Sequence, residues 1–74
     1  MTDNLNPNYY QFSGGAQPVD IAEHLTFNTG NALKYLASAG RIDGVHKTNK
    51  LEDMQTAVWY IYREINRLTK EADE

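Results

Sequence analysis

A row of polar side chains between positions 31 and 41 is the part of this sequence best suited to binding chemistry. Asn31, Lys34, Ser38 and Arg41 follow one another at steps of three, four and three residues, the spacing that places side chains on one face of an α-helix. Lysine meets phosphate as a point charge, arginine meets it as a planar fork, and the ring of Tyr35 can stack on a base. The row therefore predicts a binding site for a phosphate-bearing nucleotide, although a solvated helix face would show the same pattern.

Two further aromatic side chains precede this row. Tyr9 and Tyr10 lie in a segment rich in Asn, Pro, Ser and Gly, and segments that remain disordered are usually poor in aromatic residues. Two interpretations are open: the tyrosines close over a ligand, or they hold the segment against a neighbouring subunit. The predicted ligand-binding residues are Tyr9, Tyr10, Asn31, Lys34, Tyr35, Ser38 and Arg41.

Gly30 stands at the beginning of the same polar row. Glycine within a helix lowers helix stability by about 1 kcal/mol relative to alanine, so we expect Gly30 to have a packing or binding role. Either a ligand approaches the backbone at the helix N-terminus, or another helix packs tightly against it. The Gly14-Gly15 pair belongs to no phosphate-binding glycine motif and is typical of a turn.

The sequence offers no recognisable catalytic set. It contains no cysteine, which excludes disulfides and thiolate chemistry. His24 and His46 stand far apart with no cysteine between them, which argues against a structural zinc site. The acidic residues near positions 20 and 52 fit helix N-termini, where negative charge is favourable. We therefore predict no catalytic residue, no metal and no cofactor.

The elements that must position these residues are helical. The pattern predicts an extended N-terminal arm over residues 1–17, followed by a single helical domain over residues 18–74. Pro18 suits a helix start, and a short helix should run from there to about Leu25. A second should span about Phe27 to Ala39, with Thr26 or Asn28 as its cap and Gly40 as its end.

A long helix is predicted from the Asn49–Glu52 capping-box spacing to about Ala72. Its apolar positions repeat at steps of three and four residues, which is a heptad seam. At 1.5 Å per residue this helix spans roughly 33 Å, and the second helix spans only about 20 Å, too short to cover the seam. We therefore predict a homo-oligomer whose interface contains Leu51, Met54, Val58, Trp59, Ile61, Tyr62, Ile65 and Leu68.

Length, charge and hydropathy restrict the function classes. The 74 residues allow one small domain, and a net charge of −3 argues against a general nucleic-acid-coating protein. No apolar run approaches the roughly 20 residues of a membrane span, and the first residues lack the basic and apolar regions of a signal peptide. The sequence predicts a cytoplasmic protein that binds neither nucleic acid nor membranes.

The order of several motifs resembles one known family. NPNYY is followed by VDIAEHL, then by GNALKYLASAGRIDG, then by LEDMQTAVWYIYREINRL. This order, over nearly everything from Asn6 to Leu68, is similar to the small phage SaV-like domain, a domain of unknown function. The pattern matches at Gly30, Asn31, Lys34, Tyr35, Ala39, Gly40, Asp43, Gly44, Leu51, Glu52, Asp53, Ala57, Trp59, Tyr60, Arg63 and Glu64. The chain departs from it at Tyr9-Tyr10, where His-Tyr is usual, and at Ser38, where Arg is usual.

The resemblance implies a phage protein that works in the host cytoplasm and binds nucleotides, since a related domain occurs in a phage nucleotide kinase that has no P-loop. By analogy with other small phage proteins, the expected function is a non-catalytic oligomeric sponge. It would sequester a cyclic dinucleotide or an ADP-ribose-type signal of host anti-phage immunity. Two alternatives remain: a nucleoside monophosphate kinase or an accessory domain of one, and a helical module that binds a host protein.

Overall fold

A helix begins at each of the three positions where the sequence provides an N-terminal cap. The computed structural model describes residues 11–44 and 49–73, with α1 at Pro18–Ala22, α2 at Phe27–Ala39 and α3 at Lys50–Asp73. A single 3₁₀ turn, Ser13–Gly15, precedes them. Within these residues all regular structure is helical and no strand occurs, which confirms the predicted all-α class.

Local hydrogen bonds explain where the helices start. Pro18 occupies the first turn of α1, and the Gln17 backbone N–H donates to Asp20 Oδ2 at 3.1 Å. Thr26 caps α2 by accepting from the Thr29 backbone N–H at 3.4 Å. Asn49 precedes α3 and accepts from the Glu52 backbone N–H at 2.9 Å. These groups satisfy donors that an α-helix leaves without partners in its first turn.

The first helix is shorter than expected from the sequence. It ends at Ala22 rather than near Leu25. The N–H groups of His24 and Leu25 turn to the carbonyls three residues earlier, on Ile21 and Ala22. This tighter hydrogen-bonding pattern closes the helix and redirects the chain into α2.

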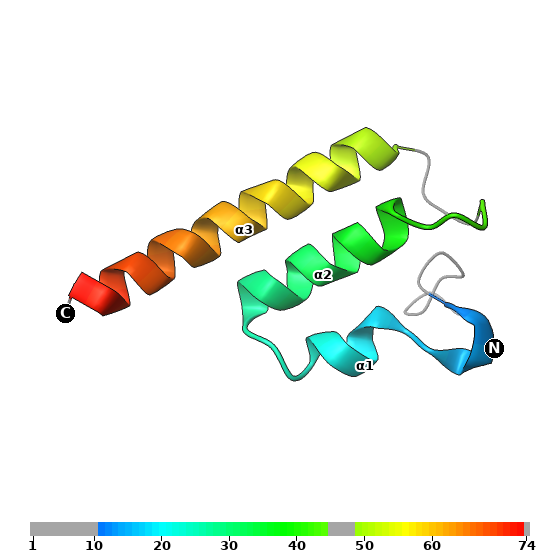
Figure 1. Cartoon of the computed structure of the whole chain (residues 1–74), viewed down its shortest axis with the longest axis horizontal. Coiled ribbons are helices and arrows are strands. Elements are labelled where there is room, and N and C mark those ends of the chain that lie inside the picture. The colour runs from blue at the N-terminus through cyan, green and yellow to red at the C-terminus, as the bar shows by residue number, and fades with distance from the viewer. Residues whose placement is uncertain (1–10, 45–48, 74) are drawn as a thin grey trace.

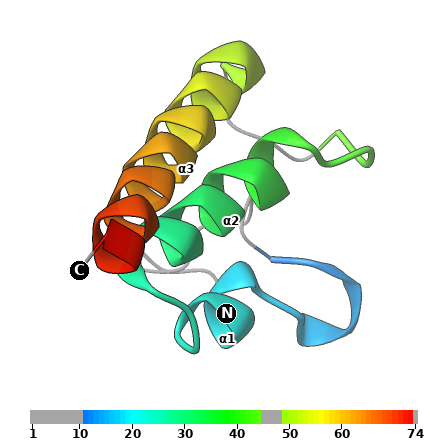
Figure 2. The same cartoon turned by 60° about the vertical axis from the view of Figure 1, so that its left-hand side comes forward.

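The helix α2 lies in the middle of the arrangement, with α3 antiparallel to it on one side and α1 on the other (Figures 1 and 2). Close approach to both neighbours depends on small residues. A Cβ added at Gly30 would lie 3.0 Å from the Ala22 carbonyl oxygen, so α1 can cross α2 only where there is no side chain. This contact supports the helix-packing interpretation of Gly30.

The hydrophobic core within the described residues is very small. Its buried hydrophobic members are three alanines, Ala32, Ala39 and Ala57. The larger apolar side chains of α3 are instead partly or largely exposed. In addition, α3 has 24 residues and α2 has 13, so α3 continues well past the N-terminal end of α2 (Figure 1). Within one chain, α2 therefore covers only part of α3.

Candidate functional site

A groove of about 750 Å³ lies between α1 and the N-terminal half of α2. Pro18, Val19, Ala22 and Leu25 form an apolar wall on the α1 side, and Phe27 contributes from the first turn of α2. The volume lies within the range of about 300–1,000 Å³ usual for small-molecule sites.

Two of the predicted ligand-binding residues line this groove. Asn31 is half-buried and Lys34 is exposed, and both follow Phe27 and Gly30 at helical spacing along α2. Glu23 also lines the groove, from the segment just after α1. The groove thus combines an apolar wall with two amide residues, Gln17 and Asn31, one hydroxyl residue, Thr26, one ammonium and one carboxylate.

The N-terminus of α2 is occupied by a carboxylate from α3. Glu64 Oε2 accepts from the hydroxyls of Thr26 at 2.6 Å and Thr29 at 3.3 Å, and Oε1 accepts from Asn28 Nδ2 at 3.2 Å. Arg67 then donates from Nε and Nη2 to the two carboxylate oxygens, both at 2.9 Å. The Glu64 side chain is only 13% exposed.

These contacts change the acidity of both charged groups. The hydrogen bonds from Arg67, followed by that from Thr26, hold the pKa of Glu64 well below its usual range. In return, the hydrogen bond to Glu64 raises the pKa of Arg67 above its already high value. An anionic ligand would therefore find the positive end of the α2 dipole already neutralised by Glu64. Among the described residues that line the groove, Lys34 supplies the positive charge.

Arg41, a predicted anion contact, binds other parts of the chain. Its side chain is 4% exposed and makes a two-pronged ion pair with Asp43, with Nε–Oδ1 at 3.0 Å and Nη2–Oδ2 at 2.5 Å. Nη1 donates to the Gln11 carbonyl oxygen at 2.5 Å, and the guanidinium lies 4.0 Å from the centre of the Phe12 ring. Arg41 follows the Gly40 cap, so helical spacing no longer determines where it points. The structure gives it the role of fastening residues 11 and 12 to the end of α2.

Ser38 and Tyr35, two more of the predicted ligand-binding residues, lie in different surroundings. Ser38 is fully buried, and its Oγ finds no hydrogen-bond partner among the described residues. Tyr35 is half-buried and stacks on Tyr60 of α3, with ring centres 6.0 Å apart. Tyr9 and Tyr10 lie outside the described residues. The groove therefore brings together Asn31 and Lys34, and it includes neither Ser38 nor Arg41.

Sequence reasoning did not place Phe27 or Arg63 in a site. The Phe27 ring lines the groove and is 77% exposed. Arg63 lies over the Trp59 ring, with its guanidinium carbon 5.1 Å from the ring centre. The second contact carries a sequence signal, because residues 59 and 63 stand four apart in a helix and share a face.

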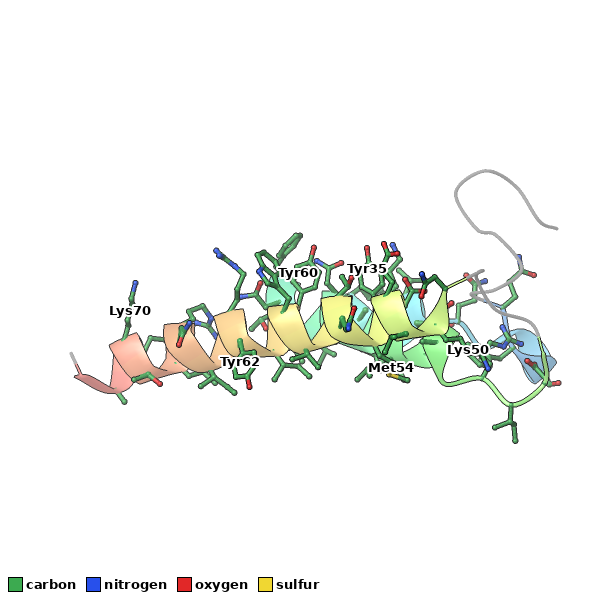
Figure 3. The ribbon with its side chains drawn as sticks, turned by 90° about the horizontal axis from the view of Figure 1, so that it is seen from above. Tyr35, Lys50, Met54, Tyr60, Tyr62 and Lys70 are labelled. Atoms are coloured by element: carbon green, nitrogen blue, oxygen red, sulfur yellow. The ribbon has the colours of Figure 1, made fainter. Side chains whose placement is uncertain are left out.

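The predicted interface residues have two different surroundings. Five of them form an aliphatic stripe along α3: Met54, Val58, Ile61, Ile65 and Leu68. Met54 is half-buried, and each of the other four residues is 40–50% exposed. Leu51 and Tyr62 are exposed as well. Trp59 differs, because its ring contacts Tyr60 at 5.0 Å. Figure 3 shows Tyr35 and Tyr60 on one side of α3, and Met54 and Tyr62 on the opposite side.

Residues 11–44 and 49–73 hold no group of three or more His, Cys, Asp or Glu side chains placed to bind a metal ion. No helix in this part of the chain is long and apolar enough to cross a membrane.

Comparison of the chain with protein-family models, with curated proteins and with solved structures found no match.

Proposed function

We propose that this chain binds a phosphate-bearing nucleotide in the groove between α1 and α2 and does not transform it chemically. The observation that carries the proposal is the meeting of Lys34 and Asn31 with the exposed Phe27 ring beside one apolar wall. An ammonium and an amide suit a phosphate and its neighbouring hydroxyls, and an aromatic ring suits a base.

The composition of the groove sets the charge of its ligand. Lys34 supplies positive charge, and Glu23 places a carboxylate in the same lining. A ligand with a dense cluster of phosphates would be repelled by Glu23, so one or two phosphates in the groove fit best. Such a ligand is consistent with the sponge function implied by the SaV-like resemblance, with a cyclic dinucleotide or an ADP-ribose-type signal as cargo in the cytoplasm of a phage-infected host.

The working form in this proposal is a homo-oligomer joined through the aliphatic stripe of α3. A core of three alanines among the described residues stabilises a single chain poorly. The stripe repeats at the steps of three and four residues that suit helix pairing. A second copy of the chain has the matching surface, since two identical stripes complement each other about a twofold axis.

A module that binds a host protein is the second candidate function. Trp59 is 54% exposed and Tyr62 is 63% exposed, and large exposed aromatic residues mark many protein interfaces. Self-association and host binding would compete for Tyr62, so the oligomeric state of the purified chain distinguishes them.

The proposed function is tested by substituting Lys34. Native mass spectrometry with a panel of nucleotides identifies a ligand and its stoichiometry, and calorimetric titration then gives its affinity. Lys34→Ala should weaken binding tenfold to a hundredfold, since a charge-assisted hydrogen bond contributes about 1.5–3 kcal/mol. The fold should survive, because Lys34 is exposed.

The matched control is Lys70→Ala, an exposed lysine in the last turns of α3. Equal weakening by both substitutions would show that only diffuse charge attracts the nucleotide. Incubation with nucleoside monophosphates and ATP, followed by chromatography, addresses the kinase alternative. Phosphoryl transfer in that assay would replace the binding proposal with the enzymatic one.

A further inference from the structure

Four aromatic rings form a connected cluster across α2 and α3, which we call the aromatic ledge: Phe27, Tyr35, Trp59 and Tyr60. Tyr60 is at its centre. It stacks on Tyr35 at 6.0 Å with an interplanar angle of 16°, and it meets Phe27 edge-on at 6.2 Å and Trp59 edge-on at 5.0 Å. These distances and angles are typical of stabilising ring pairs.

The two outer rings of the ledge are exposed, unlike those of a core cluster. Phe27 is 77% exposed and Trp59 is 54% exposed, whereas Tyr35 and Tyr60 are half-buried between them. The inner pair therefore holds the α2–α3 contact together. The outer pair presents two ring surfaces to solvent, one from each helix.

The ledge is continuous with the proposed nucleotide groove. Phe27 belongs to both, because it lines the groove and also contacts Tyr60. Two rings of the ledge, Tyr35 and Tyr60, lie on the side of α3 opposite to Met54 and Tyr62 (Figure 3). Pairing of chains through the aliphatic stripe would therefore leave the side with Tyr35 and Tyr60 accessible.

Positive charge is present at both ends of this continuous surface. Lys34 lines the groove at one end, and Arg63 lies over the Trp59 ring at the other. Phe27 and Trp59 are separated by the single ring of Tyr60. The surface therefore offers two pairs of an aromatic ring and a cation: Phe27 with Lys34, and Trp59 with Arg63.

We propose that the aromatic ledge is a second base-binding subsite, so that the ligand is a dinucleotide. One base and its phosphate would occupy the groove beside Phe27 and Lys34. The second base would stack on Trp59, and Arg63 would meet the second phosphate. This inference rests on the proposed function, because the first base occupies the groove described there.

A dinucleotide fits this surface better than a mononucleotide or a long single strand does. A mononucleotide would use one ring and one cation and leave the other pair without a role. A long single strand needs a row of cations to offset its charge, whereas this chain has a net charge of −3 and its groove lining contains Glu23.

The test uses the fluorescence of Trp59, which is the one tryptophan of the chain. The full chain is titrated with the linear dinucleotide pApA and, separately, with AMP, while calorimetry measures the affinity of each. We expect pApA to quench Trp59 saturably and to bind at least tenfold more tightly than AMP, since stacking of a base on an aromatic ring gives roughly that factor or more. AMP should bind without comparable quenching.

Two variants complete the experiment. Trp59→Leu should reduce the affinity for pApA about tenfold or more and leave the affinity for AMP unchanged. Ile42→Ala, which removes an exposed apolar side chain from the segment after α2, should affect neither. Circular dichroism verifies that both variants fold.

The outcomes separate the two proposals. If AMP binds and Lys34→Ala weakens it, while Trp59→Leu leaves pApA binding unchanged, the second subsite is wrong and the groove remains. If neither nucleotide binds, both proposals are wrong. If a (dA)20 strand binds more tightly than pApA and quenches Trp59 equally well, the ledge is a single-strand surface and the dinucleotide class is overturned.

Discussion

Glu64 supplies, from within the chain, the negative charge that the N-terminus of α2 attracts. Its two oxygens accept hydrogen bonds from Thr26, Thr29 and Asn28, while Arg67 holds it from its own helix. One carboxylate therefore ties the start of α2 to the middle of α3. It is the polar counterpart of the stacked tyrosines, which join the same two helices.

The stability of the chain should fall in acid through Glu64. Its pKa is lowered from an ordinary value of 4.5, so the charged form is the one that the folded state favours. The stabilisation is therefore complete above about pH 4.5 and is lost as pH falls below that value toward the lowered folded pKa. Thermal unfolding at pH 7 and at pH 3 should show a smaller loss for Glu64→Gln than for the unmutated chain. An identical loss in both proteins would contradict this role.

Arg41 should contribute to stability more than to ligand binding. Arg41→Ala removes the partner of Asp43 and of the Gln11 carbonyl, so we expect a loss of about 2 kcal/mol in urea unfolding. Arg41→Lys should restore little of this, because an ammonium cannot reproduce the planar fork. A stable Arg41→Ala variant that had lost nucleotide affinity would instead support the anion contact expected from the sequence.

At the scale of elements, α3 presents different chemistry on its different faces. One face packs on α2 through Ala57 and Glu64, a second carries the aliphatic stripe, and a third carries Trp59 and Arg63. A helix of 24 residues can do this because its side chains turn through all directions every 3.6 residues. We infer a division of labour in which the stripe joins copies and the aromatic face binds ligand.

A charge placed in the aliphatic stripe should dissociate the oligomer. Ile61→Asp would bury a carboxylate between two apolar surfaces, which costs several kcal/mol. Analytical ultracentrifugation should show a monomer or an unfolded chain. Asn66→Asp is the control, because it adds the same charge at an exposed position of the same helix and should leave the oligomer intact. A monodisperse, folded monomer of the unmutated chain at micromolar concentration would refute the interface.

The start and end of α2 could be predicted from sequence because local chemistry determines them. Thr26 caps the helix through its own hydroxyl, and Gly40 follows its last residue. The surroundings of Ser38 and Arg41 could not be predicted in this way. Helical spacing gives the direction of a side chain and does not show which distant segment covers it. For Arg41, that segment is residues 11 and 12.

The aromatic ledge illustrates the same limit. Tyr60 is far in sequence from Phe27 and Tyr35, and its contact with them depends on the register of two antiparallel helices. The heptad pattern of α3 identifies its apolar positions. It does not reveal that Trp59 lies with Tyr60, separate from the aliphatic stripe.

At the scale of the whole molecule, the three helices form an open arrangement with extents of 45 × 25 × 20 Å. The long dimension follows α3, which reaches past its neighbours (Figure 1). The proposed ligand surface crosses the short dimension, from α1 over α2 to α3. The proposed assembly through the aliphatic stripe and the proposed ligand surface therefore use different side chains.

The three-alanine core also has a calorimetric consequence. The heat capacity change on unfolding grows with the apolar area that becomes exposed, and ordinary domains give about 12–15 cal/mol/K per residue. An isolated copy already exposes most of the large apolar side chains among the described residues, so it should give much less. In the proposed oligomer each further copy would hide more of that area, so scanning calorimetry should record a larger heat capacity change and a higher melting temperature as the protein is concentrated.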